Sequence, residues 1–235
     1  IAVALGASTM LADEPIQRLP PARIVIDEDI LEAFVDEPCH HFEAARDAFV
    51  ANRYPQAAEH LRKATAYLRL EAARASDSDR AALDASVRAL QATALAVNHG
   101  QVRAVERLYE AFARAHLALA NHHCIKSAHR CCRPGTFSDK REMSRTGHDL
   151  KAATMDLSRA LRWAGDKPDK ETQQLLDASQ RAADKLIQQE GGSQVDVQRA
   201  IHRLHGKLEN LIGRKIMLAQ PLTPVNDGSA REMVR

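Results

Sequence analysis

The sequence predicts an all-α fold, an antiparallel bundle of six to seven helices, and three observations support this. Aromatic residues make up only 4% of the 235 residues while 27% are charged and Ala and Leu are abundant, a composition that favours helices over sheets. Apolar side chains recur three and four residues apart, and no segment alternates as a strand would. The links between periodic segments are mostly short, so successive helices should be antiparallel neighbours.

Helix-starting and helix-stopping residues bound the periodic segments. Acidic, Ser and Pro residues precede them, and Gly or Asn residues follow several of them. Asn98 and Gly100 can end a helix, yet the periodicity resumes at Val102, so either one kinked helix or two helices meeting at Gly100 fits the pattern. Trp163 is expected to close the end of the bundle. The predicted helices cover residues 36–52, 54–75, 76–97, 102–130, 141–165, 169–190 and 193–219, with a break at residues 131–140.

The two ends of the chain differ in composition from the periodic centre. Residues 1–12 are apolar or small, as in the last part of a secretory signal peptide, although a basic region and a good cleavage site are lacking. They are expected to be a truncated signal-peptide remnant or simply an apolar tail, followed by a lead segment, 13–26, the helical bundle, 27–219, and a disordered tail, 220–235. A signal remnant would make the protein periplasmic, and a periplasmic protein can form disulfides.

Charge and hydropathy argue against two classes of partner. The net charge is only +2, from 33 basic and 31 acidic residues, and neither sign forms a long block, so we expect no nucleic-acid binding. No apolar run reaches the eighteen or so residues that a membrane span needs, so we expect no membrane span. A protein partner or a homo-oligomer remains compatible with the sequence.

A weak internal repeat relates two predicted hairpins. The segment "AAEHLRKATAYLRLEA" aligns with "TGHDLKAATMDLSRAL" at an offset of 89 residues, which pairs Leu61 with Leu150, Ala64 with Ala153 and Leu68 with Leu157. Either a duplicated helical hairpin or the chance matching of Ala and Leu in any helical chain explains it.

Two resemblances follow from these segments. The stretch "AFVANRYPQAAEHLRKA" resembles one tetratricopeptide-like hairpin, but a working array needs at least three units. Together with "GHDLKAATMDLSRAL" and the N-terminal segment, it also resembles the periplasmic helical-bundle proteins of the YfdX kind. That resemblance implies a stress-response protein of the bacterial envelope without defined catalytic residues.

A cluster of histidines and cysteines is the one chemical feature of the sequence. The segment from His116 to Cys132 holds four of the eleven histidines and three of the four cysteines. Residues seven apart share a helix face, so His116 aligns with His123, His122 with His129, and Cys124 with Cys131. These three pairs lie on three different faces of the helix. A metal site would therefore need further ligands from another helix. The triplet Cys39–His41 mirrors His122–Cys124 and could supply them if the two helices run antiparallel. The candidate ligands for zinc or copper are His116, His122, His123, Cys124, His129, Cys131, Cys39, His40 and His41.

Structural roles compete with the metal hypothesis. In an exported protein Cys39 can pair with Cys124 or Cys131 in a disulfide, the cysteines can also remain free thiols, and histidines on amphipathic helices often only donate a hydrogen bond. His202 and His205 are interpreted as surface or boundary residues. Known hydrolase, metalloprotease, P-loop and di-iron motifs are absent from the sequence, so we expect no enzyme. The sequence thus predicts a non-enzymatic exported bundle that handles metal or envelope stress, with a disulfide-stabilised interaction scaffold as the alternative.

Overall fold

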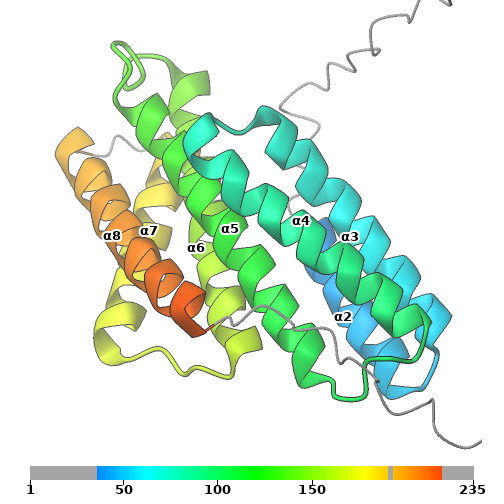
Figure 1. Cartoon of the computed structure of the whole chain (residues 1–235). Coiled ribbons are helices and arrows are strands. Elements are labelled where there is room, and N and C mark those ends of the chain that lie inside the picture. Colours follow the sequence, from blue (N-terminus) through cyan, green and yellow to red (C-terminus); the bar gives the residue numbers. More distant parts are fainter. Residues whose placement is uncertain (1–35, 190–192, 219–235) are drawn as a thin grey trace, which may run out of the picture.

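The computed structural model describes residues 36–189 and 193–218, and side chains as far as Gly213. Within these residues it consists of seven helices packed as antiparallel neighbours, without strands, which confirms the predicted fold class (Figure 1). The predicted signal remnant, the lead segment and the tail lie outside the described residues. The helices are α2 (Glu37–Val50), α3 (Tyr54–Arg74), α4 (Asp77–Asn98), α5 (Glu106–Cys131), α6 (Lys140–Ala164), α7 (Lys170–Gln188) and α8 (Gln194–Leu218).

Helix α5 is the central element. In Figure 1 it lies between α3 and α4 on one side and α8 on the other, and it also packs along α6. Its N-terminal half joins a core with α2, α3 and α4, and its C-terminal half joins a second core with α6, α7 and α8. Because α5 is enclosed from several directions, polar positions on more than one of its faces are buried.

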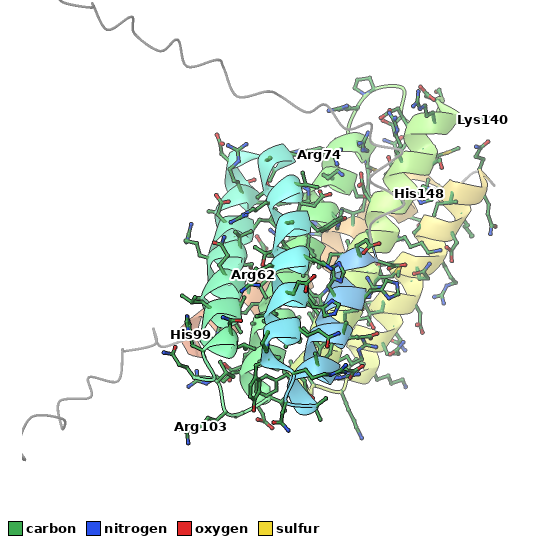
Figure 2. All side chains as sticks on the ribbon, turned by 90° about the vertical axis from the view of Figure 1, so that its right-hand side faces the viewer. Arg62, Arg74, His99, Arg103, Lys140 and His148 are labelled. Carbon is green, nitrogen blue, oxygen red and sulfur yellow. The ribbon has the colours of Figure 1, made fainter. Side chains whose placement is uncertain are left out.

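The chain divides into two helices at Gly100. Helix α4 ends at Asn98, and Gly100 has a φ of +65°, a left-handed conformation that glycine adopts without strain. Helix α5 then begins only at Glu106. Two helices, and not one kinked helix, are therefore present. Figure 2 shows that α3 and α4 run antiparallel, with Arg74 at the end of α3 far from His99 just after the end of α4.

Side-chain caps set the starts of two helices. The Asp139 carboxylate accepts a hydrogen bond from the backbone N–H of Arg141 at 2.8 Å and begins α6. The Asp169 carboxylate accepts one from the N–H of Thr172 at 2.7 Å and begins α7, where the sequence predicts a start. An acidic cap satisfies amide groups that lack an intrahelical partner and also favours the helix dipole.

The residues matched by the internal repeat occupy equivalent environments. Those on α3 are fully buried in the first core, and those on α6 are fully buried in the second. This agrees with a duplicated hairpin, although an apolar stripe on any buried helix would give the same result. The matched residues are Leu61, Ala64 and Leu68 on α3 and Leu150, Ala153 and Leu157 on α6.

None of the helices in the described part of the chain has the length and apolar character that crossing a bilayer requires.

Gly147 provides a test of the packing between α6 and α7. A Cβ at this position would lie 2.9 Å from the Ala183 carbonyl oxygen and equally close to Leu186 and Ile187. We expect Gly147→Ala to lower the free energy of unfolding by about 1–3 kcal/mol through overpacking. The measurement is urea denaturation followed by circular dichroism.

Gly206→Ala is the matched control for that variant. Gly206 lies within α8, and nothing lies within 4 Å of a Cβ built there. Alanine should therefore raise stability by about 0.5–1 kcal/mol through helix propensity alone. Equal effects of the two substitutions would show that α6 and α7 do not approach as described.

Candidate functional site

Three histidines of α5 point into the interior. His116, His122 and His123 are each at most 3% exposed, although histidine is usually only partly buried. A buried polar group is costly unless it is hydrogen-bonded, so the partners of these rings decide their role. The partners are carboxylates from α3, α4 and α6.

His122 bridges two buried carboxylates. Its Nε2 lies 3.0 Å from Glu71 Oε2 on α3, and its Nδ1 contacts an oxygen of Asp79 at the start of α4. Since each ring nitrogen faces an acceptor, both donate a hydrogen bond when the ring is an imidazolium. Burial alone would raise the pKa of Glu71, but the hydrogen bond from His122 and the nearby cationic groups lower it to about 2. The same ring and Ser76 lower the pKa of Asp79 against the effect of burial.

A second buried group surrounds Asp156 on α6. Its Oδ1 accepts a hydrogen bond from His116 Nδ1 at 2.9 Å, and its Oδ2 lies 3.9 Å from His123 Nε2. His116 Nε2 and His123 Nδ1 are buried without a hydrogen-bond partner. Burial lowers the pKa of His123, and the carboxylates of Glu71 and Asp156 offset this only in part. His123 is therefore a neutral imidazole near pH 7.

Charged side chains close the α6 side of this group. Asp149 accepts from Lys126 at 3.2 Å and from Arg130 Nε at 2.9 Å, and lies 4.0 Å from His123 Nδ1. The carboxylate is thus neutralised from α5. The cluster as a whole is a polar core that links α3, α4, α5 and α6.

All four cysteines are free thiols, so the predicted disulfides from Cys39 to Cys124 or Cys131 are not formed. Burial raises the pKa of Cys124 to about 12, and burial with its neighbour Cys132 raises that of Cys131 to about 11. Because the thiolate is the metal ligand, these two protonated thiols are poor ligands near neutral pH. Cys132 is exposed.

The mirrored triplets do not form a shared site. Cys39 contacts Glu43 and Arg162, whereas Cys124 lies in the second core with its thiol 3.7 Å from the carbonyl oxygen of Ile201. Burial raises the pKa of Cys39 as well.

The histidines of the first triplet have other surroundings. His40 is exposed, and His41 lies near His60, with 3.4 Å between their Nδ1 atoms, and near Glu37. The structure thus gives the two triplets different neighbours, because the ring of His122 is turned toward α3 and α4.

An open groove collects the other histidines and cysteines of this region. It has a volume of about 880 Å³ and lies along α5 between α8 and the first turns of α4. We call it the α5–α8 groove. His129, Cys132 and His202 are exposed, and His205 is half-buried with Nδ1 3.8 Å from Glu209. The polar residues that line it are Ser78, Asn121, His129, Cys131, Cys132, Gln198, His202, His205 and Glu209.

Among the described residues, no group of three or more His, Cys, Asp or Glu side chains is arranged to hold a metal ion. Comparison of the chain with protein-family models, with curated proteins and with solved structures finds no match. The resemblance to YfdX-like proteins therefore stays a prediction.

Sequence reasoning missed one set of residues. Glu71, Asp79 and Asp156 are the carboxylate partners of the buried histidines but lie 40–51 residues from them in the chain. Acidic residues inside the apolar stripes of two helices, at Glu71 and Asp156, were the available signal. His202 is exposed and His205 is half-buried, as expected for surface or boundary residues, and both line the same groove as His129 and Cys131.

The buried polar core predicts a loss of stability on acidification. The folded-state pKa of His123 lies below the ordinary 6.5, so the unfolded chain binds more protons as the pH falls. Stability should decline from about pH 6.5 downward, by up to about 1.4 kcal/mol per pH unit while the pH lies between the two pKa values. A second decline should begin near pH 4.5 and continue toward pH 2 as Glu71 is protonated. The measurement is urea unfolding from pH 8 to pH 3.

His123→Gln separates the two declines. It should remove much of the loss between pH 6.5 and pH 5, whereas His41→Gln should remove less because the side chain of His41 is 24% exposed against 4% for His123. An unchanged pH dependence in His123→Gln would contradict this account. The charged or titratable groups around the ring of His123 are Glu71 from α3, Asp149 and Asp156 from α6, and His122 and Lys126 from α5.

Proposed function

We propose that this chain is a non-enzymatic helical-bundle protein that binds a transition-metal ion, zinc or copper, in the α5–α8 groove. The observation that carries the proposal is the pairing of potential ligands there. His129 lies in the last turn of α5 and Cys132 is the residue that caps this helix, while His202 and His205 are one turn apart on α8. Residues three apart share a helix face, so two helices can present four ligands to one groove.

The chemistry of these side chains suits the ions named. Imidazole nitrogen and thiolate sulfur together are ligands for zinc and copper, while magnesium and calcium prefer oxygen. The ligands are open to solvent, so an ion has a path of entry. Because the side chains are not assembled into a metal site, binding requires His129, Cys132 and His202 to change rotamer, which exposed side chains do at small cost.

The buried polar core is a weaker candidate for the metal. His116 and His122 already donate to carboxylates, and the thiol of Cys124 is protonated and enclosed. An ion would have to break these interactions and enter the interior of the bundle. We therefore interpret the nitrogens of His116 and His123 that lack a hydrogen-bond partner as a result of how the core packs, and not as metal ligands.

Export to the periplasm and a role in metal handling or envelope stress belong to the same proposal. They rest on the apolar N-terminal segment and on the resemblance to YfdX-like proteins. A soft-ligand site that is open to solvent is consistent with a protein that takes up and releases an ion.

A protein-interaction scaffold is the second candidate, and the apolar side of the groove favours it. Five aliphatic side chains line the groove beside the histidines, and an apolar strip with a polar rim is typical of a docking surface. This scaffold would be held together by the polar core, since no disulfide is formed. The five are Ala82, Ile125, Ala128, Ile201 and Ile212.

Calorimetric titration of the untagged, chelator-treated chain with zinc tests the metal proposal. We expect one ion per chain, and we expect the double variant His129→Ala/His202→Ala to bind about tenfold more weakly or worse, a loss of at least about 1.4 kcal/mol. Cys132→Ser should weaken binding as well, because a hydroxyl is a poor zinc ligand.

The control removes the same number of histidines elsewhere. His99→Ala/His148→Ala changes two side chains that do not line the groove and that Figure 2 shows near opposite ends of the molecule. It should leave zinc affinity unchanged. Absence of stoichiometric binding, or an equal loss in both double variants, would rule out the groove as the metal site.

A further inference from the structure

Helices α7 and α8 pack side by side (Figure 1), and a groove with a volume of about 280 Å³ lies between them. We call it the α7–α8 groove. The residues that line it differ from those that line the α5–α8 groove and from those that form the polar core. It is therefore a separate surface from the proposed metal site.

The α7–α8 groove is strongly basic. Four cationic side chains line it, two from each helix, against one carboxylate, that of Asp196. The excess of three positive charges in this one groove is larger than the net charge of the whole chain, +2. All four cationic side chains are exposed, so a solute can reach them. They are Arg181 and Lys185 on α7 and Arg199 and Arg203 on α8.

Most of these cations have no counter-ion within the described part of the chain. Arg181, Lys185 and Arg203 make no ion pair with any described residue. Arg199 lies 3.0 Å from Asp196, but the two side chains are 64% and 66% exposed, so this pair contributes little to stability. An anion that enters the groove therefore meets guanidinium and ammonium groups that are free to bind it.

The acidic residues beside Arg181 are bonded elsewhere. Asp184 accepts a hydrogen bond from Lys151 of α6 at 3.3 Å, and Asp177 accepts one from Gln173 at 2.8 Å. Both lie within one helical turn of Arg181 in sequence, yet neither lines the groove. The donors of the Arg181 guanidinium thus remain available on the groove side.

The shape of the groove favours a small ligand over a protein partner. Its inner residues Leu175, Val197 and Ala200 are at most 8% exposed, so it offers little apolar surface for the anchor side chains on which protein docking depends. The end of α7 and the start of α8 meet at one end of the groove, so their opposite dipoles largely cancel. The cationic side chains therefore supply the attraction.

We propose that the α7–α8 groove binds a phosphate group, carried either by a small soluble ligand or by a lipid headgroup. A phosphate monoester bears a charge of about −1.5 to −2 near neutral pH, which matches the excess of three positive charges better than one carboxylate does. A planar guanidinium group can donate to two phosphate oxygens at once, while Lys185 adds a point charge.

Calorimetric titration of the full, chelator-treated chain at low and constant ionic strength tests a soluble ligand. The probes are glucose 6-phosphate, gluconate and glucose, which all have six carbons but carry about two, one and no negative charges. We expect saturable binding of glucose 6-phosphate, binding of gluconate that is about tenfold weaker or worse, and none of glucose. In a ¹H–¹⁵N spectrum the resonances that move should belong to residues 175–185 and 193–203.

Co-sedimentation with vesicles tests a lipid headgroup. Phosphatidylcholine vesicles that contain phosphatidic acid present a phosphate monoester, and vesicles of phosphatidylcholine alone are the control. Binding of glucose 6-phosphate without binding of the vesicles identifies a soluble ligand. Binding of the phosphatidic acid vesicles alone identifies a lipid headgroup, and binding of both shows that the groove recognises the phosphate group itself.

Paired substitutions locate the site. Arg181→Gln/Arg203→Gln should weaken phosphate binding about tenfold or more. Arg62→Gln/Arg88→Gln removes the same charge from exposed positions of α3 and α4 outside the groove, the first of them labelled in Figure 2, and should leave binding unchanged. Glutamine is a good helix former, and circular dichroism checks that both variants are folded. No saturable binding of either phosphate probe, or an equal loss in the two double variants, would overturn the proposal.

Discussion

The ring of His122 between Glu71 and Asp79 ties three helices together at one buried point. It joins α3, α4 and α5 through groups that are at most 2% exposed, while Ser76 also donates to Asp79 and Arg74 lies 3.7 Å from Glu71. Apolar packing alone tolerates some rotation of a helix about its axis, but two hydrogen bonds to one ring do not. The rotation of α5 is thereby set. His129 follows His122 by seven residues and so lies near the same face of α5, and both His129 and the capping residue Cys132 line the groove that α5 forms with α8 and the start of α4.

The apolar spacing predicts the helices well because that signal is local. Each helix buries a stripe set by its own residues, as Leu83, Val87 and Leu90 do on α4, and Asp169 begins α7 as expected. The sequence alone could not decide between one kinked helix and two helices meeting at Gly100, since a glycine there permits either a kink or a break. The choice depends on where α5 finds room to pack.

The cluster of imidazoles was visible in the sequence, but its partners were not. Pairing His122–Cys124 with Cys39–His41 used antiparallel order alone, whereas the rotation of each helix decides which faces meet. That rotation turns His122 toward Glu71 and Asp79 and leaves Cys39 with Arg162. His202 and His205 lie at the surface and at its boundary as the sequence indicates, but the groove that they share with His129 depends on how α5 and α8 are rotated. Long-range contacts of this kind have no spacing rule that one sequence reveals.

Equilibrium unfolding of two variants at pH 7 tests the central role of the His122 bridge most directly. His122→Ala removes a ring that hydrogen-bonds two buried carboxylates, which should cost about 1–3 kcal/mol for each group that loses its partner. The triple variant Glu71→Gln/Asp79→Asn/His122→Gln keeps polar groups of similar size without charge and should lose less than the single variant. A single variant as stable as His99→Ala, or a triple variant less stable than the single one, would contradict the account.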